Sequence, residues 1–287
     1  MRQSPRIRCR QIEDADIEAV ALLLTKSGFG GSKELWLARL DRLANHPTPV
    51  GCPKYGVLLE VNDVSVGVLL LIHTSNADDK TIKCNVSSWF VWPSFRIYAS
   101  LLVKYALSRR DITYFNISPL PHTLNTLTAQ GYTKYCSGRF VTIPALSRVQ
   151  SGVRIEKVET PVEPGLDLSR YEAELLMDHR AFGFLSIVAT VAGVRYPFVF
   201  QIRSKYRLVR FVELVYCRNF QNFADLAAPI GYFLAKRAIF LVMVDANGPV
   251  PGLIGKYQKA TPKYFKGPNQ PELGDIAYSE RVLLGIG

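Results

Sequence analysis

The stretch Trp89-Phe90-Val91-Trp92-Pro93-Ser94-Phe95-Arg96 decides the fold, because an apolar strand runs there into a short polar turn. An amphipathic helix follows it, ends at Arg109-Arg110, and leads into a second apolar strand at 112–118. The same order returns in the second half, with strand 212–216, turn 217–219, a helix ending at Lys236-Arg237, and strand 239–245. The second strands start at 112 and 239, an offset of 127 residues that the basic pairs share. The sequence therefore predicts one structural unit used twice.

This unit has a known electrostatic property. A strand-turn-helix places the first free N–H groups of the helix at the mouth of the sheet, where the helix dipole favours an anion such as a pyrophosphate. Because such units occur throughout α/β proteins, the repeat indicates architecture more strongly than chemistry.

Length and composition suggest a globular protein of about two domains. The chain has 287 residues, of which 48% are hydrophobic and 21% charged, an ordinary balance for this class. Its longest apolar run, 64–72, is about half the roughly 20 residues that a membrane-spanning helix requires. No signal-peptide pattern follows the basic N-terminus. We therefore expect a cytoplasmic protein without a membrane span.

The cysteines, histidines and net charge limit the kinds of cofactor and partner that we expect this protein to bind. The cysteines are odd in number, lack zinc-ligand spacing and lie mostly near apolar runs, as reduced core residues do; they are Cys9, Cys52, Cys84, Cys136 and Cys217. No grouping of histidines or carboxylates suggests a metal site. The net charge of +11 would attract anions such as coenzyme phosphates. Long Lys/Arg runs and an RNA-binding signature are missing, which argues against specific nucleic-acid binding.

Hydrophobic periodicity predicts the elements of both halves. In the first half we expect strands at 7–10, 55–61, 64–74, 81–92, 112–118 and 139–143, and helices at 17–25, 33–44 and 122–130 besides the one ending at 110. In the second half we expect strands at 153–158, 185–192, 195–203, 211–216, 239–245 and 276–284, and helices at 168–181 and 253–258 besides the one ending at 237. The Pro/Ser/Gly-rich stretch 144–165 suggests domains at 1–148 and 149–287. The predicted class is α/β (α+β), with a mixed, mostly antiparallel sheet and helices on both faces in each half.

Three motifs give the first half a resemblance to the GNAT-type N-acetyltransferases. Residues 7–10 with 14–20 resemble the first strand and helix of that family, and 90–96 resembles its fourth strand entering the pyrophosphate turn. Residues 126–132 resemble its terminal helix and the Gly-aromatic pair after it. Since the second half is a weaker copy, the whole chain resembles a tandem acyl-CoA acyltransferase-like protein with two GNAT-like domains.

The resemblance implies a co-substrate and a reaction. Acetyl-CoA or a longer acyl-CoA would bind between two splayed parallel strands and pass its acyl group to the amine of a small molecule or peptide. The residues implied to bind the coenzyme are Val91, Phe95, Arg96, Ile97, Tyr98, Ala99 and Ser100 in the first half, and Cys217, Arg218 and Asn219 in the second.

The chain also departs from the family pattern. Ala99 and Leu101 stand where the family has Gly or Ala, so that backbone N–H groups can approach phosphate. Leu127 stands where a tyrosine usually protonates the leaving thiolate, and an asparagine expected near Leu120 is missing.

The second half keeps more polar groups, so we expect any catalysis there. Amine acylation needs a base, and an acid for the departing thiolate. Glu213 is the candidate base, Tyr216 the candidate acid, and Asp245 a candidate substrate contact. Each also has a structural interpretation: an outward strand residue for Glu213, packing for Tyr216, and a plain turn for Asp245.

Three functions remain open from the sequence. The first is an acyl-CoA-dependent N-acyltransferase. The second is a catalytically silent protein that keeps the fold to bind a ligand or partner, which the missing turn glycines and tyrosine favour. The third is an aminoacyl-tRNA-dependent transferase. The acceptor and the oligomeric state stay open.

Overall fold

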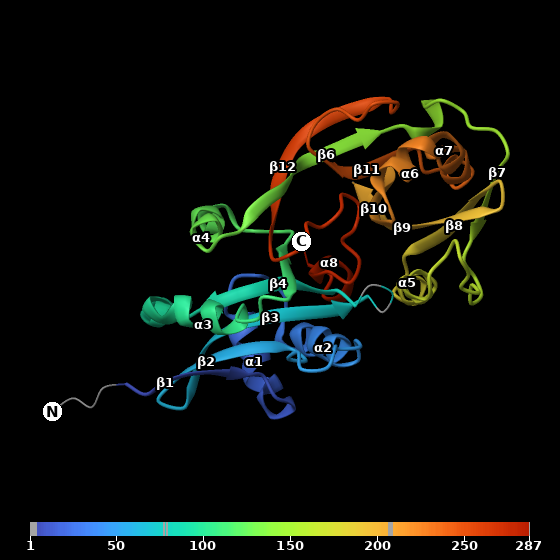
Figure 1. Cartoon of the computed structure of the whole chain (residues 1–287). Coiled ribbons are helices and arrows are strands. Elements are labelled where there is room, and N and C mark those ends of the chain that lie inside the picture. The colour runs from blue at the N-terminus through green and yellow to red at the C-terminus, as the bar shows by residue number, and fades with distance from the viewer. Residues whose placement is uncertain (1–4, 77, 79, 206–208, 287) are drawn as a thin grey trace.

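The computed structural model describes residues 5–76, 78, 80–205 and 209–286. The strands of this part of the chain form one 12-stranded sheet in the order β1-β2-β3-β4-β5-β12-β6-β11-β10-β9-β8-β7. The two ends of the sheet lie in two lobes, and the short helix α8 lies between them (Figure 1).

The first half builds one end of the sheet and the helices that cover it. Its elements are β1 (Ile7–Gln11), α1 (Ile17–Thr25), α2 (Lys33–Ala44), β2 (Gly56–Val61), β3 (Val64–Ser75), β4 (Ile82–Val91), the 3-10 helix η2 (Pro93–Tyr98), α3 (Ala99–Ala106), β5 (Ile112–Asn116), α4 (Leu124–Ala129) and β6 (Thr133–Thr142). The predicted bounds of α1 and α2 are confirmed residue for residue. The Ser32 hydroxyl accepts the N–H of Leu35 and so caps α2, a preferred role for serine.

The second half repeats this order in shorter form. Its elements are β7 (Val153–Lys157), α5 (Arg170–Ala181), β8 (Leu185–Val191), β9 (Val194–Lys205), β10 (Val209–Cys217), α6 (Phe220–Asp225), α7 (Ala227–Ala235), β11 (Leu241–Ala246), β12 (Gly255–Lys266) and α8 (Glu280–Leu283). Ser169 and Glu172 form a capping box that begins α5, satisfying two backbone N–H groups reciprocally.

Two pairs of parallel strands stand out in an otherwise antiparallel sheet. β4 runs parallel to β5 from Ile82 to Asn85, and β10 runs parallel to β11 from Phe211 to Glu213. They are the two copies of the repeated unit seen in the sequence. Buried apolar clusters cover both faces of the sheet, so the predicted mixed, mostly antiparallel class with helices on both faces is confirmed.

The two halves exchange their last strands. β12, from the second half, lies between β5 and β6, and β6, from the first half, pairs with β11. Hydrogen bonding therefore continues across the predicted boundary at 148/149, and neither half completes its part of the sheet alone. The division into 1–148 and 149–287 stays a prediction about the chain, while the sheet itself is undivided.

Two predicted elements near the C-terminus are wrong. The helix at 253–258 is replaced by the start of β12, where a Cβ at Gly255 would lie only 2.2 Å from the Val141 carbonyl oxygen of β6. The glycine thus permits close strand contact that a local helical pattern does not reveal. The strand at 276–284 is instead a turn followed by α8, with Tyr278 at a φ of 53°.

Candidate active site

A cavity of about 360 Å³ lies where β4 and β5 part. The parallel pairing stops at Asn85, while β4 continues to Val91 and β5 ends at Asn116. On one side of the sheet α3 and α4 line the cavity, and on the other side the α1–α2 loop and the segment after α8 line it; the residues include Val103, Leu107 and Leu127, then Phe29 and Ile286. The cavity therefore crosses the sheet.

A β-bulge shapes the β4 wall of this cavity. Between the pairs Val68↔Phe90 and Leu70↔Ser87, β4 contains one residue more than β3, and Ser88 has a φ of 51°. Bulges of this kind re-aim backbone groups and often lie near active sites. Within the described ranges, no segment is hydrogen-bonded through its backbone to the β5-facing edge of residues 86–91. That edge is open to a ligand.

Glu280 brings a buried carboxyl group into the cavity. Its residue is 3% exposed and lines the cavity, although it comes from α8 in the second half. The Ser118 hydroxyl donates to Glu280 Oε1, and the Glu280 backbone N–H donates to Asn85 Oδ1 at 2.6 Å. Burial raises the pKa of Glu280, against a smaller lowering by hydrogen bonds from Ser118 and Ser87. A raised carboxyl pKa in a cleft is typical of a general acid or base.

Two further polar groups border the cavity. The indole N–H of Trp89, a lining residue, is buried and has no hydrogen-bond partner within the described part of the chain, and an unmet buried donor is costly. Tyr132 also lines the cavity, and burial raises the pKa of its phenol well above the ordinary range. The site thus offers a free donor, a buried carboxyl group and a phenol that stays protonated.

Comparisons with known proteins identify the fold. No protein-family model matches the sequence, and no curated protein is detectably similar to it. A GCN5-related N-acetyltransferase from Anabaena variabilis ATCC 29413 is similar in structure, with a TM-score of 0.57 at 11% identity over 91% of this chain and 72% of that one. The chain has the fold of the GCN5-related N-acetyltransferases. A second such enzyme, from Kribbella flavida, gives 0.57 at 13% identity over 91% and 71%, and a conserved protein of unknown function from Enterococcus faecalis V583 gives 0.57 at 11% over 95% and 74%.

The GNAT fold predicted from the motifs is confirmed, and the cavity lies in the gap between its splayed parallel strands. In the described part of the chain, no helix is long and apolar enough to cross a membrane. The same residues contain no group of three or more His, Cys, Asp or Glu side chains able to hold a metal ion.

The predicted pyrophosphate turn of the first half lies in the chain between Trp89 and Val103, two residues that line the cavity, but none of residues 91–100 is among the lining residues. Val91 ends β4, Phe95 to Tyr98 belong to η2, and Ala99 and Ser100 begin α3. Arg96 is exposed, and no hydrogen bond or ion pair of its side chain is found among the described residues. Leu101 is 46% exposed and is not among the residues that line the cavity. This turn is accessible, and coenzyme binding by its residues stays a prediction.

The corresponding gap in the second half is closed by the chain itself. Beyond the divergence of β10 and β11, Cys217 N–H donates to the Gly274 carbonyl and Ile276 N–H to the Val215 carbonyl, both at 2.9 Å. Phe223, in the helix α6 that follows β10, is fully buried and packs against Phe198 and Phe200. The β10 edge that would face a ligand is therefore occupied.

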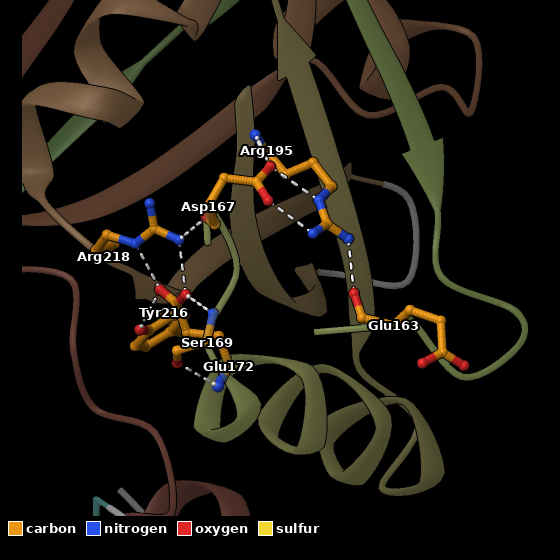
Figure 2. A network of polar contacts seen from close by, with 7 residues as sticks. All are labelled: Glu163, Asp167, Ser169, Glu172, Arg195, Tyr216 and Arg218. Carbon is orange, nitrogen blue, oxygen red and sulfur yellow. Dashed lines mark hydrogen bonds and ion pairs between the residues drawn. The ribbon is translucent and has the colours of Figure 1, made fainter. Parts of the chain in front are cut away.

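The predicted phosphate ligand Arg218 is likewise engaged. Its guanidinium donates to both carboxylate oxygens of Glu172, at 2.7 and 2.6 Å, and to the Asp167 carbonyl at 2.6 Å. Figure 2 shows this network continuing through Asp167 to Arg195. The Asn219 side chain accepts the N–H of Gln221 at 2.7 Å and caps α6. Both residues have roles in holding the second half together.

The predicted catalytic residues do not meet in one place. The Tyr216 hydroxyl is buried and donates to Glu172, whereas Glu213 and Asp245 line a separate hollow. Glu213 is paired with Arg203 and Arg281, and Asp245 with Lys263. Catalysis by these three residues stays a prediction, while their contacts are those of structural partners.

Sequence reasoning counted Glu280 among the polar groups of the second half and gave it no catalytic role. It was expected on a last strand of the second half, but the structure inserts it into the gap of the first half. The one available signal was an acidic residue inside the apolar run 276–284, since charged residues are rarely buried without a partner or a function.

Proposed function

We propose that the protein is an acyl-CoA-dependent N-acyltransferase that acts in the cavity between β4 and β5. One observation carries the proposal: the cavity crosses the sheet where two parallel strands part, and the buried carboxyl group of Glu280 lies in it. The coenzyme would enter from the α3/α4 side, and the amine from the side of α8.

The residues around the cavity fit the coenzyme. Arg96 and the first N–H groups of α3 would face its phosphates, because a helix N-terminus attracts anions. The open edge of β4 and the unpartnered indole N–H of Trp89 would donate to carbonyl oxygens of its arm. Bound there, the coenzyme would supply an activated acyl thioester.

Glu280 would act as the general base. The amine nitrogen must lose a proton as its bond to the acyl carbon forms, and Glu280 would accept that proton. Ser118 and Ser87 would hold the carboxylate in position. Tyr132 would give a proton to the departing thiolate sulfur, in place of the tyrosine missing at Leu127.

The test is an acyl-transfer assay with labelled acetyl-CoA and longer acyl-CoAs against pooled amines and peptides. Glu280→Gln should bind the acyl-CoA but lose about 10²- to 10⁴-fold in turnover, the range for a general base. Glu163→Gln is the matched control, because that glutamate side chain is exposed. Full activity of Glu280→Gln, or no binding of any acyl-CoA by the wild type, would contradict the proposal.

A second candidate is a catalytically silent binding protein with the same cavity. Leu127 favours it, since this buried lining residue cannot supply a proton where the family has a tyrosine. Acyl-CoA binding without transfer to any amine would support this candidate instead.

A further inference from the structure

A second, smaller hollow of about 120 Å³ lies next to the active-site cavity. It is formed by the strands that the two halves share, and we call it the Arg139 pocket, lined on its polar side by Arg139, Glu213, Asp245, Lys263 and Arg281. Ile117 and Arg281 line this pocket, whereas the next residues, Ser118 and Glu280, line the cavity. The Arg139 pocket and the active-site cavity therefore lie on either side of the hydrogen-bonded pair Ser118 and Glu280.

The carboxylates of the Arg139 pocket are already neutralised. Glu213 Oε2 lies 3.1 Å from Arg281 and 3.4 Å from Arg203. Asp245 is paired with Lys263, whose residue is 5% exposed. Since Glu213 has two arginine partners, the pocket carries more positive than negative charge.

Two donors of the pocket remain unused. Arg281 Nε is buried and finds no hydrogen-bond partner among the residues that the structure describes. Arg139 is exposed, and its side chain makes no hydrogen bond or ion pair in the described ranges. A buried donor without a partner is costly, and an arginine fork matches carboxylate and phosphate oxygens in geometry. An anion in the pocket could accept hydrogen bonds from these arginine N–H groups.

We propose that the Arg139 pocket binds an anionic group, carboxylate or phosphate, of the amine acceptor. The proposal rests on the function proposed above, because it places the acidic end of the acceptor one residue away from the base Glu280. The volume has room for several water molecules at roughly 30 Å³ each, and so for one such group. A neutral acceptor would leave the arginine donors unmet, which makes the pocket selective.

The direct test is anion binding. Inorganic phosphate and succinate are titrated at constant ionic strength into the wild type and into Arg139→Gln, Arg139→Glu and Arg8→Gln, with calorimetric detection. Arg8 is the control, since it is exposed on the edge strand β1. We expect Arg139→Gln to weaken binding about tenfold, in line with loss of one charged hydrogen bond, and Arg139→Glu to abolish it. Binding by both variants equal to the wild type would overturn the proposal, as would no binding of either anion.

The second test uses the acceptor found in the transfer assay. Its neutral derivative, with the acidic group converted to an amide or removed, should show a KM about tenfold higher at similar kcat, and Arg139→Gln should erase that difference. An acceptor without an anionic group would overturn the inference. Anion binding can be measured without acyl transfer, so the two proposals can fail separately. An enzyme that transfers acyl groups but binds no anion would refute only this inference. A protein that binds anions but no acyl-CoA would refute only the proposed function.

Discussion

Replacing Arg218 by methionine should destabilise the fold, whereas the same change at Arg96 should weaken acyl-CoA binding. Both arginines belong to the turn of the repeated unit: Arg218 directly follows β10, and Arg96 lies in η2, five residues after the end of β4. Arg218 donates three hydrogen bonds to Glu172 and the Asp167 carbonyl, while Arg96 is exposed and has no side-chain partner among the described residues. The pair therefore separates a structural role from a ligand-binding role.

The magnitude follows from the surroundings of Glu172. Its side chain is 5% exposed, and without Arg218 it would keep only the Tyr216 hydroxyl and the Ser169 N–H. Removing one partner of a buried ion pair costs about 3 to 5 kcal/mol. Arg218 is itself 37% exposed, so solvent screening lowers this to about 2 kcal/mol. For a chain of this length, that corresponds to roughly 4 °C in Tm.

Urea denaturation and calorimetric titration with acetyl-CoA measure both properties. Arg218→Met should lose about 2 kcal/mol in unfolding free energy and bind the coenzyme as the wild type does. Arg96→Met should stay within about 0.5 kcal/mol of the wild type and bind the coenzyme about tenfold more weakly. The reasoning is refuted if Arg218→Met is as stable as the wild type, or if it is the variant that binds more weakly.

Three further predictions concern the cavity, the sheet and the closed gap. Burial raises the pKa of Glu280 above its ordinary value of 4.5. The contribution of this group to stability is therefore full below pH 4.5 and is lost as pH rises through the pKa of the folded protein. Over this pH window, urea denaturation should show that Glu280→Gln becomes more stable relative to the wild type; a difference that does not change with pH would contradict the prediction. Residues 1–148 expressed alone should fail to form a folded monomer by circular dichroism and size exclusion, and co-expression with 149–287 should restore folding. Phe223→Ala should cost about 3 to 5 kcal/mol by urea denaturation, while calorimetry should still find one acyl-CoA per chain; a second equivalent would show that the gap had opened.

Local patterns in the sequence predicted much of the fold. The bounds of α1 and α2 follow from apolar periodicity and from the Ser32 cap. The repeat predicted one structural unit in each half, because its spacing is a local feature, and the resemblance to the GNAT family implied that its two strands run parallel. The missed features are long-range: β12 pairs with β5 and β6, which lie more than a hundred residues earlier in the chain. No local signal determines such a pairing.

The candidate site was predicted only in part. The turn at Arg96 is exposed and follows the strand that borders the cavity, but its residues do not line the cavity, and coenzyme binding by them stays a prediction. Catalysis was expected in the second half because that half has more polar residues. Composition does not show that its gap is closed, because the segment at Gly274 and the side chain of Phe223 come to fill the gap only when the chain folds. Glu280 belongs to the first half in space and to the second in sequence, so its position depends on the strand exchange.

The exchange of β6 and β12 also affects the order in which the chain folds during synthesis. About a hundred residues separate the two strands, so at 5 to 20 residues per second β5 and β6 wait roughly ten seconds on the ribosome before the strand between them emerges. The strand edges that will face β12 stay unpaired in that interval, and unpaired strand edges favour aggregation. Nascent chains of this protein should therefore depend on chaperones until residue 266 has left the ribosomal tunnel.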